Sequence, residues 1–363
     1  MFLPLKNTYI KKSIEHIPAA TSAHRIAWSD HARGIAIMLV AYRHIVLGMQ
    51  TSHIPVSNAM FNFQEGFYNF RMDVFFILSG LFVANNLKKQ STFQVFRNRV
   101  YTIFYPYVVW GLILISLEVY FSQYTNRKRE WGELAKFLVQ PRVADQLWYL
   151  YILFTCSVVY LLLRQLTKNI WIQAGFAVTI YVLNFLFLKV VYDYSLISDT
   201  ANFYSYFFVG TCLPDILLNK ERSPKVLNVR NLLWLTPLFV AGQYFYLTHI
   251  DGASSWEKWF VVFFIINIVA CFWVFIVMNW ISQYKSTQWL SKVGRYSLYI
   301  YILHIPIIVF FRSIYLHSKI HLDSWLILAV LWVAALLTPI VLIKLGRPYG
   351  IEWLFSLKPK KDA

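Results

Sequence analysis

Long apolar segments separated by short polar links dominate this chain. We predict ten of them, most about 18–27 residues long, which suits helices that cross a bilayer with some tilt. Helices are expected because lipid leaves no partner for unpaired backbone groups. The predicted spans are residues 33–50, 67–87, 100–121, 147–166, 170–191, 201–218, 231–249, 256–282, 295–315 and 324–345. The pattern therefore predicts an all-α polytopic membrane bundle, in which the sixth span is short and re-entrant or broken near Gly210 and Pro214.

Basic residues are distributed unevenly between the links. Most of the 34 lysines and arginines fall near the two ends and in the links after the even-numbered spans. Positively charged loops stay in the cytoplasm, so both termini are predicted to be cytoplasmic. The chain then divides into a cytoplasmic N-terminal segment 1–32, a membrane domain 33–345 and a basic cytoplasmic tail 346–363.

The predicted outer loop 122–146 departs from this charge rule. It carries Arg127, Lys128, Arg129, Lys136 and Arg142. Two interpretations are open. The loop caps an external cleft or binds an acidic glycan, or it is a solvated amphipathic loop.

The composition is that of a membrane protein and argues against a soluble domain, a nucleic-acid-binding protein and a metal site. Hydrophobic residues make up 58% of the chain and charged residues 14%, against about 25% charge in soluble domains. The net charge of +17 comes mostly from basic residues in the links between spans, where such residues set the orientation in the membrane. It therefore predicts contact with anionic membrane lipids and no nucleic-acid partner. The three cysteines have no metal-ligand spacing, and no carboxylate–histidine cluster is apparent, so no metal is expected.

His44 is the first candidate for chemistry. It follows Arg33 by eleven residues, or ~16 Å of helical rise, which places Arg33 at one membrane surface and His44 near the midplane. An ionisable side chain at that depth indicates a functional site by default. The alternative is a core histidine that hydrogen-bonds to a neighbouring helix.

A second deep histidine repeats this arrangement. His304 follows Arg295 by ~14 Å of helical rise and is reached from the same side. Arg43 adjoins His44, and the second span begins with Arg71 and Asp73. Because buried charges persist when they are paired, Asp73 is expected to neutralise Arg43 or to orient His44.

Three further clusters each have a functional and a structural interpretation. In the functional interpretation Ser79 is a nucleophile, and in the structural one Ser79 and Gly80 let two helices approach closely. Arg97 and Arg99 clamp a phosphate, or they only mark the cytoplasmic side. Trp148 and Tyr149 at the predicted outer face stack on a sugar, or they belong to an interfacial aromatic belt.

In this order, the clusters resemble the acyltransferase 3 family of polytopic membrane proteins. The resemblance runs from Asp30 to about Pro306. It covers the Arg33/His44 spacing, Arg71-Met72 with Phe75-Phe76-Ile77-Leu78-Ser79-Gly80, Arg97 and Arg99 with Pro106-Tyr107, Leu147-Trp148-Tyr149-Leu150, and Ser297-Leu298-Tyr299-Ile300-Tyr301-Ile302-Leu303-His304. Two positions depart from the family pattern. Arg43 replaces a small or aromatic residue, and Asp73 stands where proline is common.

The resemblance implies an O-acyltransferase similar to exopolysaccharide and fucose O-acetyltransferases. Such a protein moves an acetyl or succinyl group from acetyl-CoA, or another short acyl-CoA, to a sugar hydroxyl. It implies a bacterial inner-membrane location and a carbohydrate acceptor in a surface polysaccharide, an exopolysaccharide or a lipid-linked precursor. A polysaccharide-synthesis complex is the implied protein partner, and monomer and homodimer both remain open.

This activity gives each candidate residue a role. His44 is the general base or is transiently acylated, with Arg33, Arg71, Asp73 and His304 around it. Arg71 or Tyr299 stabilises the carbonyl oxygen. Acyl-CoA is held by Arg33, Arg97, Arg99, Arg295 and Tyr299, and the acceptor by Arg71, Trp148 and Tyr149. The alternative function is a transporter of an acylated lipid or glycan intermediate, since intramembrane charges also mark transport pathways.

Overall fold

The computed structural model describes residues 26–121, 129–188, 195–249, 253–318 and 320–357, and within these ranges it contains helices and no strands. Eight helical segments in this part of the chain are long and apolar enough to cross a membrane. They are Ala27–Thr51, Asn58–Asn86, Thr92–Tyr120, Pro141–Leu166, Ile170–Phe187, Lys258–Ile281, Ser297–His317 and Ser324–Tyr349. The predicted all-α polytopic bundle is confirmed. Residues 1–25 and 358–363, which hold much of the predicted cytoplasmic ends, lie outside the described ranges.

The first half of the chain contains α1 and the helices that follow it up to η4. They are α1 (Ala27–Thr51), α2 (Asn58–Gly66), α3 (Arg71–Asn86), α4 (Thr92–Arg99), the π-helix η1 (Val100–Phe104), α5 (Tyr105–Tyr120), α6 (Glu133–Lys136), the 3-10 helix η3 (Pro141–Leu147), α7 (Trp148–Leu166), α8 (Ile170–Leu183) and the π-helix η4 (Asn184–Leu188).

The second half contains the remaining helices. They are α10 (Leu196–Thr211), α11 (Pro214–Leu217), α12 (Ser223–Val226), η5 (Val229–Asn231), α13 (Leu232–Thr248), α14 (Ala253–Ile281), η6 (Lys285–Thr287), α15 (Gln288–Arg295), α16 (Ser297–His317), α17 (Ser324–Gly346), η7 (Arg347–Tyr349) and η8 (Ile351–Leu354).

Two predicted spans are shorter than full membrane helices. The predicted span 201–218 is the 16-residue α10, and the predicted span 231–249 is the 17-residue α13. The helix α10 ends at Thr211, ahead of the separate short helix that Pro214 begins. Proline cannot continue the hydrogen-bond ladder of a helix, which explains why the sixth segment is broken.

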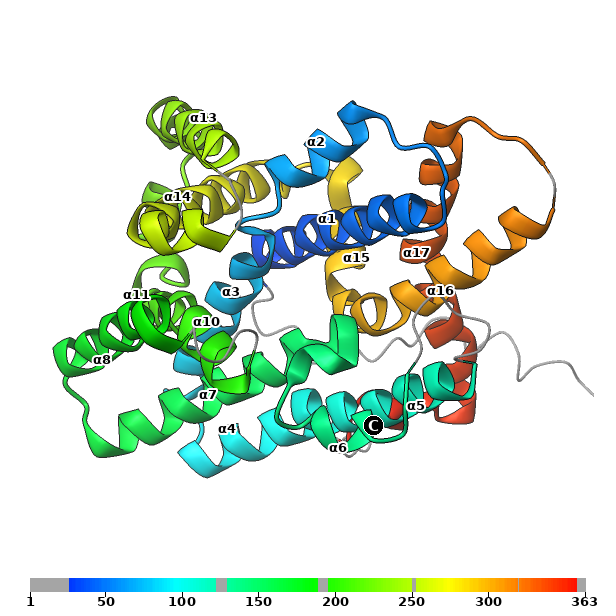
Figure 1. The fold of residues 1–363 in the computed structure, drawn as a ribbon. Helices are drawn as coiled ribbons and strands as arrows, with labels where there is room; N and C mark the ends of the chain where they lie inside the picture. The colour runs from blue at the N-terminus through cyan, green and yellow to red at the C-terminus, as the bar shows by residue number, and fades with distance from the viewer. Residues whose placement is uncertain (1–25, 122–128, 189–194, 250–252, 319, 358–363) are drawn as a thin grey trace, which may run out of the picture.

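The helix α1 lies at the centre of the bundle (Figure 1), in contact with α3, α14, α15, α16 and α17. Glycines bring two helix pairs unusually close. A Cβ at Gly294 of α15 would collide with the Asp30 carbonyl of α1, and one at Gly210 of α10 would collide with the Ile77 carbonyl of α3. Close approach through small residues is how helices associate inside a membrane. These contacts fix α1, which carries Arg33 and His44, and α3, which carries Arg71 and Asp73.

The fourth span is predicted from Leu147, and α7 begins at Trp148, directly after the 3-10 segment η3 with its non-helical backbone at Ala144 and Asp145. The extra segment η3 is charged, yet Arg142 pairs with Asp199 at 2.9 Å and Arg129 pairs with Asp145. Paired charges can be buried at a much smaller cost than single ones. Trp148 and Tyr149 open α7 as predicted, and Tyr149 is buried in the bundle.

Candidate active site

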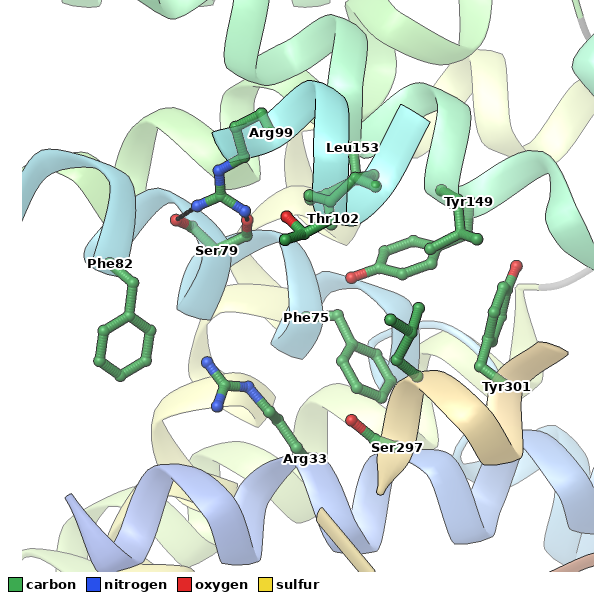
Figure 2. Close-up of a pocket in the computed structure, with 13 residues that line it drawn as sticks. Arg33, Phe75, Ser79, Phe82, Arg99, Thr102, Tyr149, Leu153, Ser297 and Tyr301 are labelled. Carbon is green, nitrogen blue, oxygen red and sulfur yellow. Dashed lines mark hydrogen bonds between the residues drawn. The ribbon is translucent and has the colours of Figure 1, made fainter. Parts of the chain in front are cut away.

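A cavity of about 230 Å³ opens among α1, α3, α4, η1, α7 and α16. Arginines reach it from α1 and from α4, and tyrosines from α7 and α16 (Figure 2). It is lined by Arg33, Phe75, Ser79, Phe82, Arg99, Thr102, Ile103, Tyr149, Leu150, Leu153, Ser297, Leu298 and Tyr301. Ligand clefts usually measure about 300–1,000 Å³, so this cavity suits a narrow chain rather than a whole nucleotide.

Arg33 and Arg99 point toward the cavity from opposite sides (Figure 2). Arg99 donates to Ser79 Oγ at 3.1 Å and to the Ser79 carbonyl at 3.4 Å. Arg33 pairs with Asp30 at 3.5 Å, and its guanidinium lies 4.9 Å from the Phe82 ring centroid. Two guanidinium groups at one end of a small cavity make that end suitable for an anionic group.

Two tyrosines connect the cavity to the deeper part of the bundle. The ring centroids of Tyr149 and Tyr301 are 5.2 Å apart, and that of Tyr301 lies 6.1 Å from His304. The Tyr301 hydroxyl is buried and has no hydrogen-bond partner among the residues described. A buried hydroxyl without a partner is costly, so this group is available to a ligand in the cavity.

His44 and His304 face each other, with ring centroids 5.1 Å apart. His304 is fully buried, and its Nδ1 lies 3.0 Å from the Ile300 carbonyl and 2.8 Å from the Tyr301 carbonyl. A carbonyl only accepts, so Nδ1 carries the proton and Nε2 keeps its lone pair in the neutral ring. That Nε2 is buried and lacks a partner in the described part of the chain. The two predicted deep histidines thus form one pair.

Three side chains crowd the other side of His44. The guanidinium of Arg43 lies 4.0 Å from the Tyr68 ring centroid, and that of Arg71 lies 4.7 Å from the same centroid. Arg43 also pairs with Glu65 at 3.0 Å and contacts Gln64. Arg71 is 7% exposed and has no carboxylate partner among the described residues. The cluster therefore contains one neutralised arginine and one that is not neutralised.

Asp73 belongs to a different polar network. It is 1% exposed and accepts a hydrogen bond from Asn267 at 2.8 Å. Asn267 also accepts from Asn69 at 2.8 Å and donates to Tyr206 at 3.2 Å. The expected pairing of Asp73 with Arg43 is wrong, because Glu65 at the end of α2 takes that place. No contact between Asp73 and His44 is present either.

Several predicted residues lie outside the cavity lining. Arg97 and Arg295 are exposed, and Arg295 donates to the Ser291 carbonyl at 3.4 Å. Tyr299 packs against Phe355, with ring centroids 4.9 Å apart. The Trp148 ring is covered by the Arg142 guanidinium at 4.2 Å. Of the residues predicted to bind acyl-CoA, Arg33 and Arg99 are the two that reach the cavity.

The family model of an acyltransferase domain, Acyl_transf_3, matches residues 26–344. The chain belongs to the acyltransferase 3 family. No curated protein and no solved structure matches it significantly. The matched region contains both parts of the candidate active site, from Arg33 in α1 to His304 in α16.

Membership in the acyltransferase 3 family makes this a membrane acyltransferase. Among the described residues no group of three or more His, Cys, Asp and Glu side chains is placed to hold a metal ion. In the loop that was predicted to be external, the described arginines Arg129 and Arg142 pair with carboxylates of the acyltransferase itself. Arg129 is buried among Glu118, Glu133 and Asp145, which favours a structural role over glycan binding. Arg127 and Lys128 lie outside the described residues.

Tyr301 and Ser297 were not predicted as members of the acyltransferase site, and Ser79 was considered only as a nucleophile or a packing residue, not as a partner of Arg99. Tyr301 precedes His304 by three residues, and such a pair shares one face of a helix. This spacing was the available signal for Tyr301. For Ser79 the signal was absent, because its contact with Arg99 joins separate helices. Tyr149 was assigned to the acceptor, whereas it lines the same cavity as the two arginines.

Proposed function

We propose that this protein transfers an acetyl or succinyl group from cytoplasmic acyl-CoA to a sugar hydroxyl. The acceptor is a surface polysaccharide, an exopolysaccharide or its lipid-linked precursor, at the inner membrane of a bacterium. One observation carries the proposal. The cavity lined by Arg33 and Arg99 is also lined by Tyr301, whose ring packs against His304, the partner of His44.

The donor enters at the end of the bundle that the charge distribution predicts to be cytoplasmic. Arg33 and Arg99 bind phosphate groups at the mouth, where guanidinium forks match phosphate oxygens. The cavity of about 230 Å³ admits the pantetheine arm, while the nucleotide stays outside. Arg33 lies ~16 Å of helical rise from His44, so an extended arm brings the thioester toward the histidines.

His44 then takes the proton of the acceptor hydroxyl. The hydroxyl oxygen attacks the thioester carbonyl carbon, the carbon–sulfur bond breaks, and the proton returns from His44 to the departing thiolate. His44 suits this role because the residue is only half-buried, whereas His304 is fully buried and is held by its own helix. An imidazole takes and returns protons near neutral pH.

The oxyanion of the tetrahedral intermediate needs donors placed in advance. The Tyr301 hydroxyl and the Arg71 Nε are buried donors near the histidine pair, and neither has a hydrogen-bond partner in the part of the chain that the structure describes. We therefore assign the oxyanion role to Tyr301 with Arg71. Tyr301 takes the place that was expected for Tyr299.

The His44→Ala variant tests the proposal. Membranes that contain the full chain are supplied with radiolabelled acetyl-CoA and a set of sugar acceptors, and label in the sugar is measured. We expect wild type to transfer label and His44→Ala to lose at least about 100-fold, the effect of removing a general base. Lys168→Ala, an exposed position, serves as the control.

Two results would overturn the proposal. One is wild-type turnover by correctly folded His44→Ala. The other is a wild-type protein that neither binds nor hydrolyses acyl-CoA, which would favour the transporter alternative.

A further inference from the structure

Arg312 is a cation that the proposed reaction does not use. It lies two turns beyond His304 on α16 and is half-buried. The buried stripe of this helix contains Ile300, His304 and Ile308. Arg312 continues that stripe, because residues four apart share a helix face. It therefore points into the bundle, above the histidine pair, on the side away from Arg33 and Arg99.

Gly48 of α1 makes room for the Arg312 guanidinium. A Cβ at position 48 would collide with Nη1 of Arg312. Gly48 lies one turn beyond His44, or about 6 Å of helical rise. The helices α1 and α16 thus meet in two successive layers, first His44 with His304 and then Gly48 with Arg312. The guanidinium comes within about one turn of the predicted base.

The charge of Arg312 is not neutralised by the residues that the structure describes. Among the described residues no carboxylate lies within ion-pair distance of Arg312. Arg71, on the other side of His44, also lacks a carboxylate partner there. A partly buried cation without a counter-ion is unfavourable. Arg71 lies near His44, and Arg312 reaches α1 one turn beyond His44, so this end of the bundle offers two cations to an anion.

We propose that Arg312, with Arg71, binds an oxyanion carried by the acceptor and so presents the acceptor hydroxyl to His44. This inference rests on the proposed acyl transfer. The shared chemistry is a carboxylate on the sugar or a phosphate that links the sugar to its carrier. A phospholipid headgroup is the rival ligand, but Arg312 reaches the backbone of α1 inside the bundle instead of extending outward.

Acceptor discrimination tests this assignment. The full chain in phosphatidylcholine nanodiscs receives acetyl-CoA and one of three probes, methyl β-glucoside, methyl β-glucuronide or glucose 1-phosphate. We expect wild type to prefer at least one anionic probe by about tenfold in kcat/KM, the effect of a charge-assisted hydrogen bond. Whether the carboxylate or the phosphate is preferred identifies the source of the anion.

The variants separate a binding role from a merely structural one. In Arg312→Gln the preference falls to about one, mainly through a higher KM for the anionic probe, and Arg312→Lys restores part of it. Lys136→Gln, an exposed cation of the outer loop, keeps the wild-type preference. If Arg312→Gln does not fold, Gly48→Ala supplies the test, because its methyl group displaces the guanidinium while the charge remains.

Three results would overturn the inference. They are equal use of neutral and anionic probes by wild type, an unchanged preference in Arg312→Gln, and an Arg312 effect that follows the phosphatidylglycerol content of the nanodisc instead of the acceptor. Failure of the proposed function is distinguishable, because then neither transfer nor acetyl-CoA hydrolysis occurs with any probe.

Discussion

At the residue scale, the two histidines differ in how firmly they are held. His304 is bound to two carbonyls of its own helix, so its tautomer and its ring orientation are fixed. No hydrogen bond from a described residue fixes His44, and the residue is only half-buried. A fixed ring beside an accessible one suits a division of labour, in which His304 shapes the site and His44 exchanges protons.

The hydroxyl of Tyr301 gives a prediction at this scale. Tyr301→Phe removes a buried, unpartnered donor and leaves the ring that packs against Tyr149. We expect kcat for acyl transfer to fall by about 10²-fold, as when an oxyanion donor is lost, with little change in the KM for acyl-CoA. Tyr296→Phe, a tyrosine outside the cavity lining, is the matched control. Equal kcat values for Tyr301→Phe and wild type would remove Tyr301 from the mechanism.

Single residues were predictable only where their chemistry contradicts their surroundings. His44, His304 and Arg71 stand out because apolar segments rarely contain ionisable groups. The partner of Arg43 was not predictable in this way. Glu65 lies in the segment before α3, and the turn between Gly66 and Arg71 brings it to Arg43 instead of Asp73.

At the scale of elements, glycine contacts decide how close the site-bearing helices lie. The helix α10 crosses α3 where Gly80 and Gly210 meet the facing backbone. The helix α15 meets α1 at Gly34 and Gly294. The first contact holds Ser79 beneath Arg99, and the second holds Arg33 beside Ser297. The cavity therefore depends on backbones that touch, and any side chain at these positions would widen it.

Gly210→Ala tests this dependence. The new methyl group collides with the Ile77 carbonyl, and overpacking of this kind costs about 1–3 kcal/mol. We expect a lower melting temperature of the purified protein and weaker acyl-CoA binding. Gly175→Ala is the control, because nothing lies within 4 Å of its added Cβ. There the change is neutral or slightly stabilising, since alanine favours a helix. Similar melting temperatures for the two variants would contradict this packing model.

The boundaries of elements were less predictable than their existence. The start of α7 at Trp148 matches the predicted start at Leu147, whereas the segment η3 ahead of it was not predicted, because Arg142 and Asp145 make it look like a surface loop. In the structure their charges are satisfied by Asp199 and Arg129. Such compensation joins residues that are far apart in the chain, so the hydrophobic pattern of η3 alone does not reveal it.

At the scale of the whole molecule, the apolar pattern predicted the class of fold, and the assembly of the site came from the packing. Arg33 and His44 lie on one helix, so their separation follows from helical rise. Arg99 and Tyr301 reach the same cavity from other helices. The order in which helices pack is not contained in any one segment, which explains why Arg97, Arg295 and Tyr299 were grouped with residues that line the cavity.

We propose that the arginine cavity and the histidine pair are the two ends of a single acyl-CoA path. The most direct measurement is the steady-state kinetics of acetyl transfer by the full chain carrying Arg99→Gln or His44→Gln. We expect Arg99→Gln to raise the KM for acetyl-CoA about tenfold with little change in kcat, because it removes donor binding at the mouth. We expect His44→Gln to lower kcat at least about 100-fold with little change in that KM. An unchanged KM in Arg99→Gln, or wild-type kcat in His44→Gln, would contradict the claim.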